Sequence, residues 1–178
     1  MKTIIIGGVA GGASAAARLR RLDEKAEIIV LEKGEFVSFA NCGLPYYIGG
    51  EITDKSALTL QSPESFKARF NIDVRIFNEA VNINPNEKTV TVKNVLTGKN
   101  YTETYETLIL SPGAAPIIPD IPGISSANVF TLRNIPDTIK IKNYINTEKP
   151  KSAVVVGGGY IGVEMAENLS KAGLDVSI

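Results

Sequence analysis

The chain has 178 residues, of which 44% are hydrophobic and 21% are charged, a composition typical of a soluble globular protein with one domain and part of a second. Its 19 basic residues balance 19 acidic ones, so no net field favours nucleic acid as a partner, and no apolar stretch is long enough to span a membrane. The single cysteine excludes an internal disulfide and fits a reducing, cytoplasmic compartment. Because histidine is absent, we predict no metal site.

The chain opens with a predicted β–α–β unit. Residues 2–7 (KTIIIG) form a buried strand, residues 11–22 (GGASAAARLRRL) a helix and residues 27–33 (EIIVLEK) a second strand. The start of the chain also imitates a secretory signal, but glycines interrupt its apolar run. Helical periodicity predicts that one stripe faces the sheet (Ala15, Leu19, Leu22) and that another is free to meet a ligand (Ser14, Arg18, Arg21).

The turn between the first strand and the helix has the glycine pattern of a dinucleotide site. Gly7 and Gly12 hold the outer places of that pattern, whereas Val9 takes the middle place. Glu32 follows Gly12 by twenty residues, at the end of the second strand, where a carboxylate can hold ribose hydroxyls. An ordinary glycine-rich turn remains the alternative interpretation.

The only cysteine, Cys42, lies in residues 38–50 (SFANCGLPYYIGG). Residues 43–48 can form a short helix with Pro45 in its first turn, which places the sulfur at the positive end of the helix. That position favours the reactive thiolate. An inert, buried Cys42 is the alternative.

The rest of the chain alternates between helical and strand patterns. Residues 62–70 indicate a helix, and residues 72–113 indicate a β-meander with turns near Pro85 and Gly98. Residues 116–123 (PIIPDIPG) form a connector, and a helix is expected over residues 135–145. A second strand–turn–helix follows from residue 151, and its glycines fit the dinucleotide pattern fully (Gly157, Gly159, Gly162). Two such turns imply two nucleotide cofactors.

In this order, the motifs resemble the pyridine nucleotide–disulfide oxidoreductases. The cysteine segment is similar to the branch that contains the coenzyme A-disulfide reductases, their persulfide-reducing relatives and the NADH oxidases and peroxidases. The resemblance implies an α/β fold: a Rossmann-like FAD-binding domain with a β-meander over residues 1–117, then the beginning of a Rossmann-like NAD(P)-binding domain over residues 118–178. It further implies that the chain is the N-terminal part of a homodimeric enzyme and is unable to turn over by itself.

The resemblance also implies a set of site residues. The FAD site would contain Gly7, Gly8, Val9, Gly12, Glu32, Lys33, Val81, Ser111, Pro112 and Gly113. The NADH or NADPH site would contain Gly157, Gly159, Tyr160 and Gly162, with Glu164 near the flavin. Coenzyme A would contact Ser14, Arg18, Arg21, Ser38 and Asn41, although the arginines also fit a solvated helix face. Cys42 would be the catalytic thiol, assisted by Asn41.

The absence of a second cysteine limits the chemistry. A dithiol enzyme of this family would carry its partner cysteine at position 47, which is Tyr47 here. Cys42 must therefore pair with an external thiol or cycle through a sulfenic acid. We expect NAD(P)H to reduce a Cys42–coenzyme A mixed disulfide by way of FAD. Persulfide, polysulfide, peroxide or oxygen reduction, and a flavin-binding module without turnover, remain open, as does the choice between NADH and NADPH.

Overall fold

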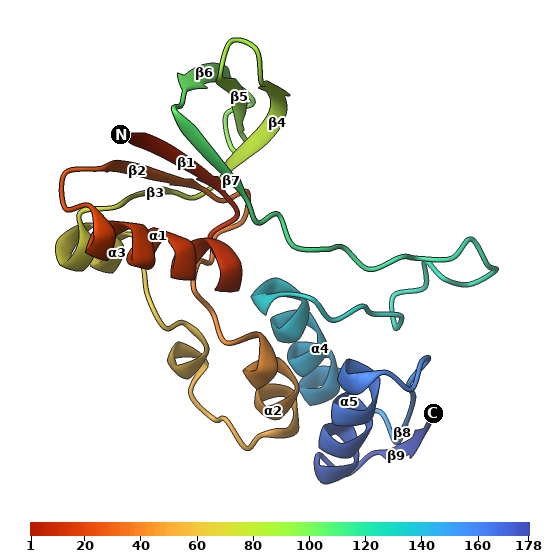
Figure 1. Cartoon of the computed structure of the whole chain (residues 1–178). Coiled ribbons are helices and arrows are strands. Elements are labelled where there is room, and N and C mark those ends of the chain that lie inside the picture. Colours follow the sequence, from red (N-terminus) through yellow and green to blue (C-terminus); the bar gives the residue numbers. More distant parts are fainter. The chain divides into compact units, whose positions relative to one another are not determined.

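A computed structural model describes all residues from Met1 to Ile178 and separates them into two compact units (Figure 1). Unit 1 contains residues 1–39 and 59–113, and unit 2 contains residues 40–58 and 114–178. The predicted α/β class is confirmed, because each unit contains parallel strands covered by helices. The division of the chain at residue 117 into two cofactor domains stays a prediction.

Unit 1 is built on a parallel sheet with the strand order β3-β2-β1-β7. The strands are β1 (Lys2–Ile6), β2 (Glu27–Leu31), β3 (Asp73–Arg75) and β7 (Thr107–Leu110). The neighbours Ile4 and Ile5 point to opposite faces, and both are fully buried. The central strands read as continuous apolar runs because both faces of the sheet are covered.

Helices cover one face of this sheet and a β-meander covers the other (Figure 1). The helices are α1 (Ala10–Leu22) and α3 (Pro63–Phe70), and the meander strands are β4 (Asn78–Asn84), β5 (Thr89–Asn94) and β6 (Asn100–Thr104). The meander turns lie where they were predicted. The predicted span of the meander, residues 72–113, was wrong at both ends, because β3 and β7 pair with the parallel sheet and pack Val74 and Ile109 beneath α1.

Helix α1 faces the sheet through small residues and through part of the predicted stripe. Ala15 and Leu19 of that stripe are partly buried and pack against the core, as predicted. Gly12, Ala13 and Ala16 are its buried residues, so the helix axis lies close to the strands. Leu22 was expected to face the sheet but is 66% exposed. The guanidinium of Arg20 holds this end of the helix instead, and it donates hydrogen bonds to the carbonyls of Asp23, Glu24, Ala26, Phe70 and Asn71. The other predicted stripe (Ser14, Arg18, Arg21) is exposed as expected.

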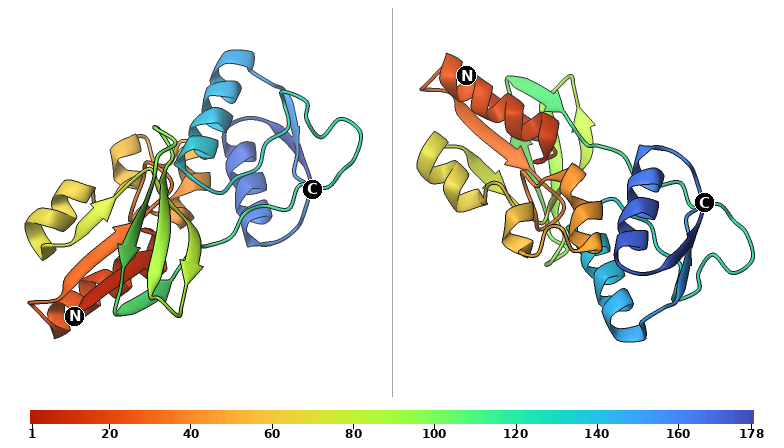
Figure 2. Two further views of the ribbon diagram at one scale, coloured as in Figure 1. Left: turned by 90° about the horizontal axis from the view of Figure 1, so that it is seen from above. Right: turned by 90° about the horizontal axis from the view of Figure 1, so that it is seen from below.

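Unit 2 packs helices against a parallel strand pair. It contains a 3-10 turn (Asn41–Gly43), α2 (Leu44–Gly49), a second 3-10 turn (Lys55–Leu58), α4 (Ile135–Glu148), β8 (Ser152–Val154), α5 (Tyr160–Lys171) and β9 (Asp175–Ser177). Figure 2 shows α5 alongside the β8–β9 pair. Residues 40–58 belong to this unit because Ile48 of α2 is buried in its core with Ile141, Met165, Leu169 and Leu174.

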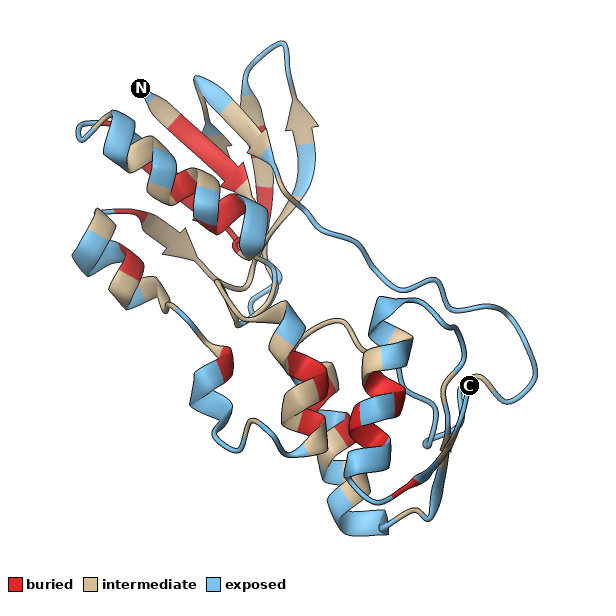
Figure 3. Ribbon diagram, turned by 60° about the horizontal axis from the view of Figure 1, so that its bottom comes forward, coloured by how far each residue is buried: buried red, intermediate tan, exposed pale blue.

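The predicted connector is extended and exposed along most of its length (Figure 3). Ile117 within it is 95% exposed.

In the glycine-rich turn that follows β8, Val156 is 96% exposed. Val154, the last residue of β8, is 75% exposed, so apolar side chains at this end of the strand are uncovered. None of the helices combines the length and apolar character that crossing a membrane requires.

Glu103 on β6 links the meander to the parallel sheet of unit 1. Its carboxylate accepts a hydrogen bond of 2.7 Å from Lys2 Nζ and one of 2.6 Å from the Arg75 guanidinium, which also bonds Asp73 at 2.8 Å. Partial burial by itself would raise the pKa of Glu103, but the bonds from Lys2 and Arg75 outweigh burial and hold that pKa below its ordinary value. These charges stabilise the join between β1, β3 and β6.

Replacing Glu103 with Gln is expected to lower the free energy of unfolding by about 1–2 kcal/mol at pH 7, because Lys2 and Arg75 each lose one charged acceptor. A carboxyl with a depressed folded pKa contributes stability that is complete above its unfolded pKa, about 4.3, and is lost as the pH falls through the folded value. Urea unfolding of wild type and Glu103→Gln should therefore converge as the pH falls below about 4.3. Exposed Glu87→Gln is the control, and a difference that persists in acid would contradict the charge mechanism.

Candidate functional site

The first dinucleotide turn, between β1 and α1, is fixed by a backbone contact that only glycine allows. Gly7 has a φ of +96°, and its carbonyl oxygen lies so close to Gly12 that a Cβ on Gly12 would overlap it. The Ser111 carbonyl blocks a side chain at Gly7 in the same way. Val9 takes the N-cap position of α1. Val9 at the middle position of the glycine pattern therefore leaves the turn intact.

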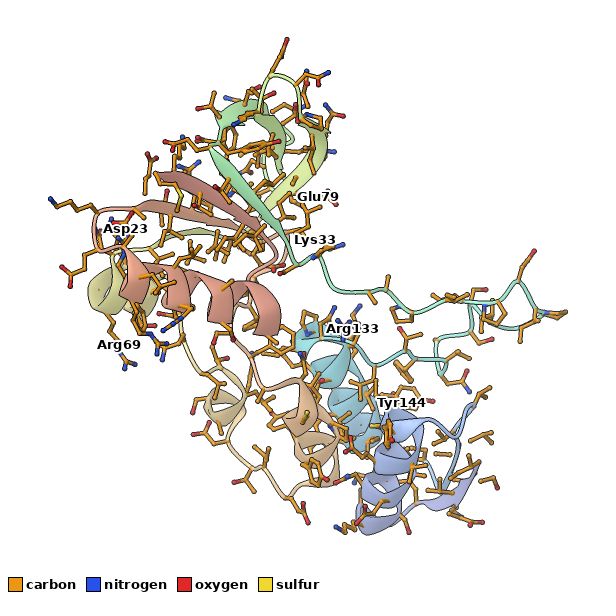
Figure 4. The ribbon with its side chains drawn as sticks, in the orientation of Figure 1. Asp23, Lys33, Arg69, Glu79, Arg133 and Tyr144 are labelled. Carbon is orange, nitrogen blue, oxygen red and sulfur yellow. The ribbon has the colours of Figure 1, made fainter.

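The carboxylate of Glu32 lies against this turn. Gly8 N donates to Glu32 Oε2 at 2.9 Å, and Gly34 N donates to Oε1 at 2.8 Å. Each carboxylate oxygen can accept more than one hydrogen bond, so both retain capacity for ribose hydroxyls. Lys33 is exposed directly after Glu32 (Figure 4). The structure thus brings Glu32 to the predicted place.

Two later segments of unit 1 join the same turn through their backbones. Ser38 N donates to the Gly8 carbonyl at 2.9 Å, and Ser38 has a φ of +47°, which is uncommon for a residue with a side chain. Ser111 N donates to the Ile6 carbonyl at 2.8 Å and starts the Ser111–Gly113 segment after β7. Val81 lies on the meander, where the register shift between Ala80 and Asn82 leaves it without a partner on β5.

The cysteine segment belongs to unit 2. Cys42 is exposed in the 3-10 turn that leads into α2, and Pro45 lies at the start of that helix, so the predicted short helix is confirmed. The alternative of a buried Cys42 is wrong. The neighbouring Asn41 has its Oδ1 buried without a hydrogen-bond partner. The thiol therefore stands at the surface of unit 2, next to a polar atom that lacks a donor.

The second dinucleotide turn repeats the steric arrangement of the first. Gly157 has a φ of +111°, and a Cβ on Gly162 would overlap the Gly157 carbonyl. Gly159 is the N-cap of α5, and Tyr160, the first helical residue, is 94% exposed. Glu164 is half-buried one turn further along α5. Unpaired N–H groups at this end of α5 suit a pyrophosphate.

The residues predicted to contact coenzyme A are divided between the two units. Unit 1 carries Ser14, Arg18, Arg21 and Ser38, whereas unit 2 carries Asn41 together with Cys42. The Arg21 guanidinium bonds the Ala17 carbonyl at 3.2 Å, and neither Arg18 nor Arg21 has a carboxylate partner. Both cations are thus available to an anionic ligand.

The sequence analysis missed two residues that contact α2. Asn168 of α5 is fully buried against Gly49, and Lys142 of α4 donates to the Ile48 carbonyl at 2.8 Å. A signal for Asn168 was present, because an asparagine three residues after Met165 falls on the apolar stripe of α5. Nothing in the sequence distinguishes Lys142 from the other lysines of α4.

Comparison with known proteins places these features in one family. The family model described as pyridine nucleotide-disulphide oxidoreductase matches residues 1–178. The chain is 46% identical over 176 residues to the coenzyme A disulfide reductase of Staphylococcus epidermidis, a match that covers 99% of this chain and 40% of that protein. The chain therefore spans about two fifths of the length of the curated relatives it matches.

Solved structures of similar proteins have the same fold. The reduced CoADR-RHD protein of Bacillus anthracis superimposes with a TM-score of 0.95 at 60% identity, covering 98% of this chain and 32% of its own. A NAD-dependent persulfide reductase from A. fulgidus gives a TM-score of 0.94 at 38% identity, covering 99% of this chain and 32% of its own.

The steric account of the first turn predicts different outcomes at two adjacent glycines. Gly12→Ala should lower the free energy of unfolding by about 2–3 kcal/mol, because the new methyl group meets the Gly7 carbonyl and the Ile5 side chain. Gly11→Ala is the matched control: its methyl group meets only the Ser111 side chain, whose hydroxyl can rotate. Urea denaturation of the full-length protein measures both, and equal losses would refute the account.

Proposed function

We propose, because this chain belongs to the pyridine nucleotide-disulphide oxidoreductase family, that the full-length protein uses NAD(P)H and FAD to reduce coenzyme A disulfide through Cys42. The observation that carries the proposal is the exposed, unpaired Cys42 at the start of α2, in a chain 46% identical to a coenzyme A disulfide reductase.

The residues of the first turn fit FAD. The close contact between Gly7 and Gly12 leaves no side chain between the backbone and a pyrophosphate, and the start of α1 supplies N–H groups. Glu32 would accept from the ribose hydroxyls, and the unpaired backbone of Val81 suits the edge of an adenine ring. Lys33 and the Ser111–Gly113 segment complete the proposed set. FAD, when bound, would pass electrons from a pyridine nucleotide to a disulfide.

The second turn fits NADH or NADPH. Gly157 and Gly159 have no neighbouring atoms in the way of a phosphate, and Gly162 lets α5 approach the turn closely. Tyr160 is exposed at the start of α5, where its ring can cover a bound nucleotide. Glu164 follows on the same helix.

Cys42 would perform the thiol chemistry. Its thiolate attacks one sulfur of coenzyme A disulfide, forms the Cys42–coenzyme A mixed disulfide and releases one coenzyme A thiolate. Two electrons that originate from NAD(P)H then cleave the mixed disulfide, which releases the second coenzyme A and restores the Cys42 thiolate. Ser14, Ser38 and Asn41 would contact the coenzyme A chain, and Arg18 and Arg21 would pair with its phosphates.

Persulfide reduction is the second candidate, and the 38% identity to the persulfide reductase favours it. The same Cys42 would attack the outer sulfur of a persulfide or polysulfide in place of coenzyme A disulfide. We further propose that the full-length protein is a homodimer and works in the cytoplasm, where a lone thiol stays reduced.

The first test concerns the covalent state of Cys42. Intact full-length protein purified without reductant should carry one adduct of coenzyme A mass on the peptide that contains Cys42, because that thiol is exposed and position 47 holds Tyr47 in place of a partner cysteine. Dithiothreitol should release the adduct as coenzyme A, as mass spectrometry of the tryptic peptide before and after treatment would record. Finding only free thiol and sulfur oxides would move the proposal to sulfenic-acid chemistry.

The second test separates Cys42 from the nucleotide sites. Cys42→Ser should retain flavin bleaching by NAD(P)H within about twofold and lose disulfide reduction by at least about a thousandfold, since a hydroxyl cannot form the mixed disulfide. Stopped-flow absorbance follows the first step, and nucleotide oxidation with coenzyme A disulfide follows the second. Ser56→Ala, in the same segment but exposed, is the control. Turnover by Cys42→Ser would remove Cys42 from the mechanism.

A further inference from the structure

Helix α2, which follows Cys42, is too short to fix its own position. It has 6 residues, from Leu44 to Gly49, whereas an isolated helix of this length is unstable in water. Its position is therefore set by its neighbours in unit 2. Ile48 provides the apolar part of that contact, since it is buried with Ile141 of α4 and with Met165 and Leu169 of α5.

A polar residue of α5 lies directly against the end of α2. Asn168 is fully buried, and a Cβ built on Gly49 would come within 2.5 Å of its Oδ1 and 2.9 Å of its Cβ. Its Nδ2 donates to the Glu164 carbonyl at 2.8 Å, which fixes the orientation of the amide and turns Oδ1 toward Gly49. The backbone of α2 thus lies very close to Asn168, and it can do so only because Gly49 has no side chain.

The Oδ1 of Asn168 has no hydrogen-bond partner. Burying an amide oxygen without a donor opposes folding, and an apolar residue at position 168 would avoid that cost. Stability alone therefore gives no reason for an asparagine here. Its shape, held rigid by the bond to Glu164, defines how far α2 can move toward α5.

A second contact holds α2 from the side of α4. Lys142 Nζ donates to the Ile48 carbonyl at 2.8 Å and lies 5.9 Å from the centre of the Tyr47 ring. The carbonyls in the last turn of a helix lack partners within the helix and carry partial negative charge, so an ammonium group here is favourable. Lys142 therefore anchors the end of α2 that is opposite Cys42.

We propose that Asn168 and Lys142 are positioning residues for Cys42. The 3-10 turn that contains Cys42 runs directly into α2, so a displacement of α2 moves the sulfur. The second strand–turn–helix of the fold, which carries the nucleotide turn at one end of α5, thereby also sets the position of the thiol. The functional meaning of this proposal rests on the proposed role of Cys42.

The test uses the full-length protein with Gly49→Ala, Asn168→Ala and the double variant, each treated with dithiothreitol and desalted so that Cys42 is a free thiol. Gly49→Ala should change the iodoacetamide alkylation rate of Cys42 by about fivefold or more and lower kcat for disulfide reduction about tenfold, with KM changed less than about twofold, because the methyl group drives α2 away from Asn168. The double variant should recover part of both changes, since Asn168→Ala removes the Oδ1 and Cγ atoms and leaves only the Cβ, 2.9 Å from the new methyl group. Asn146→Ala, exposed on α4, is the control.

The expected rescue distinguishes positioning from a local effect on the helix. Alanine is a better helix former than glycine, so without the contact Gly49→Ala would leave Cys42 unchanged or stabilise α2. A double variant no closer to wild type than Gly49→Ala overturns the role of Asn168. Alkylation requires neither cofactor nor disulfide substrate, so it tests positioning even if the protein fails to reduce coenzyme A disulfide.

A second pair of variants covers the case in which Gly49→Ala does not fold. Lys142→Met should change the Cys42 alkylation rate by about threefold, whereas Lys142→Arg, which keeps a charged donor for the Ile48 carbonyl, should stay near wild type. Lys140→Met, exposed on the same helix, is the matched control. Equal alkylation rates in Lys142→Met and wild type would overturn the role of Lys142.

Discussion

Both nucleotide turns depend on one steric constraint: the carbonyl of the first glycine lies against the α-carbon of the last. In unit 1 these residues are Gly7 and Gly12, and in unit 2 they are Gly157 and Gly162. The contact brings the first turn of the helix next to the end of the strand, so the helical N–H groups and the strand end share one small space. In unit 1 the Ser111 carbonyl also approaches Gly7, which locks β7 beside β1. The close backbone contacts of Gly7 therefore determine both the place of β7 in the parallel sheet and the shape of the candidate site.

Polar contacts hold distant segments around that constraint. Arg20 bonds the carbonyls that end α3, and so ties α1 to a helix some fifty residues later in the chain. The carboxylate of Glu103 bonds Lys2 and Arg75, and so ties the meander to the sheet. Such bonds contribute only modest net stability, but each is costly to break once its partner is partly buried. They hold α3 against α1 and β6 against the parallel sheet.

Local patterns were sufficient to predict the glycine turns, the place of Glu32 and the short helix after Cys42, because these depend on residues near one another in the chain. Contacts between distant segments were not predictable in this way. Ala15 and Leu19 pack on the core as periodicity predicted, but Leu22 on the same stripe is exposed, and the most buried residues of α1 are small ones, Gly12 and Ala16 among them. Strands β3 and β7 looked like part of the meander, since alternation alone does not indicate which sheet a strand joins. Likewise, the Gly49–Asn168 contact depends on two helices that are far apart in sequence.

Residues 40–58, which contain Cys42, pack with α4 and α5, so the position of this cysteine segment depends on unit 2. Its neighbours along the chain on both sides, Phe39 and Thr59, form an antiparallel bridge within unit 1, so the segment leaves that unit and returns at one place. Between those points, Ile48, Gly49 and the Ile48 carbonyl each meet a residue of the second strand–turn–helix region. A thiol on such an excursion takes its position from the unit it packs against rather than from the unit to which its chain neighbours belong. Substitutions far from Cys42 in sequence, on α4 and α5, therefore have a direct physical route to its reactivity.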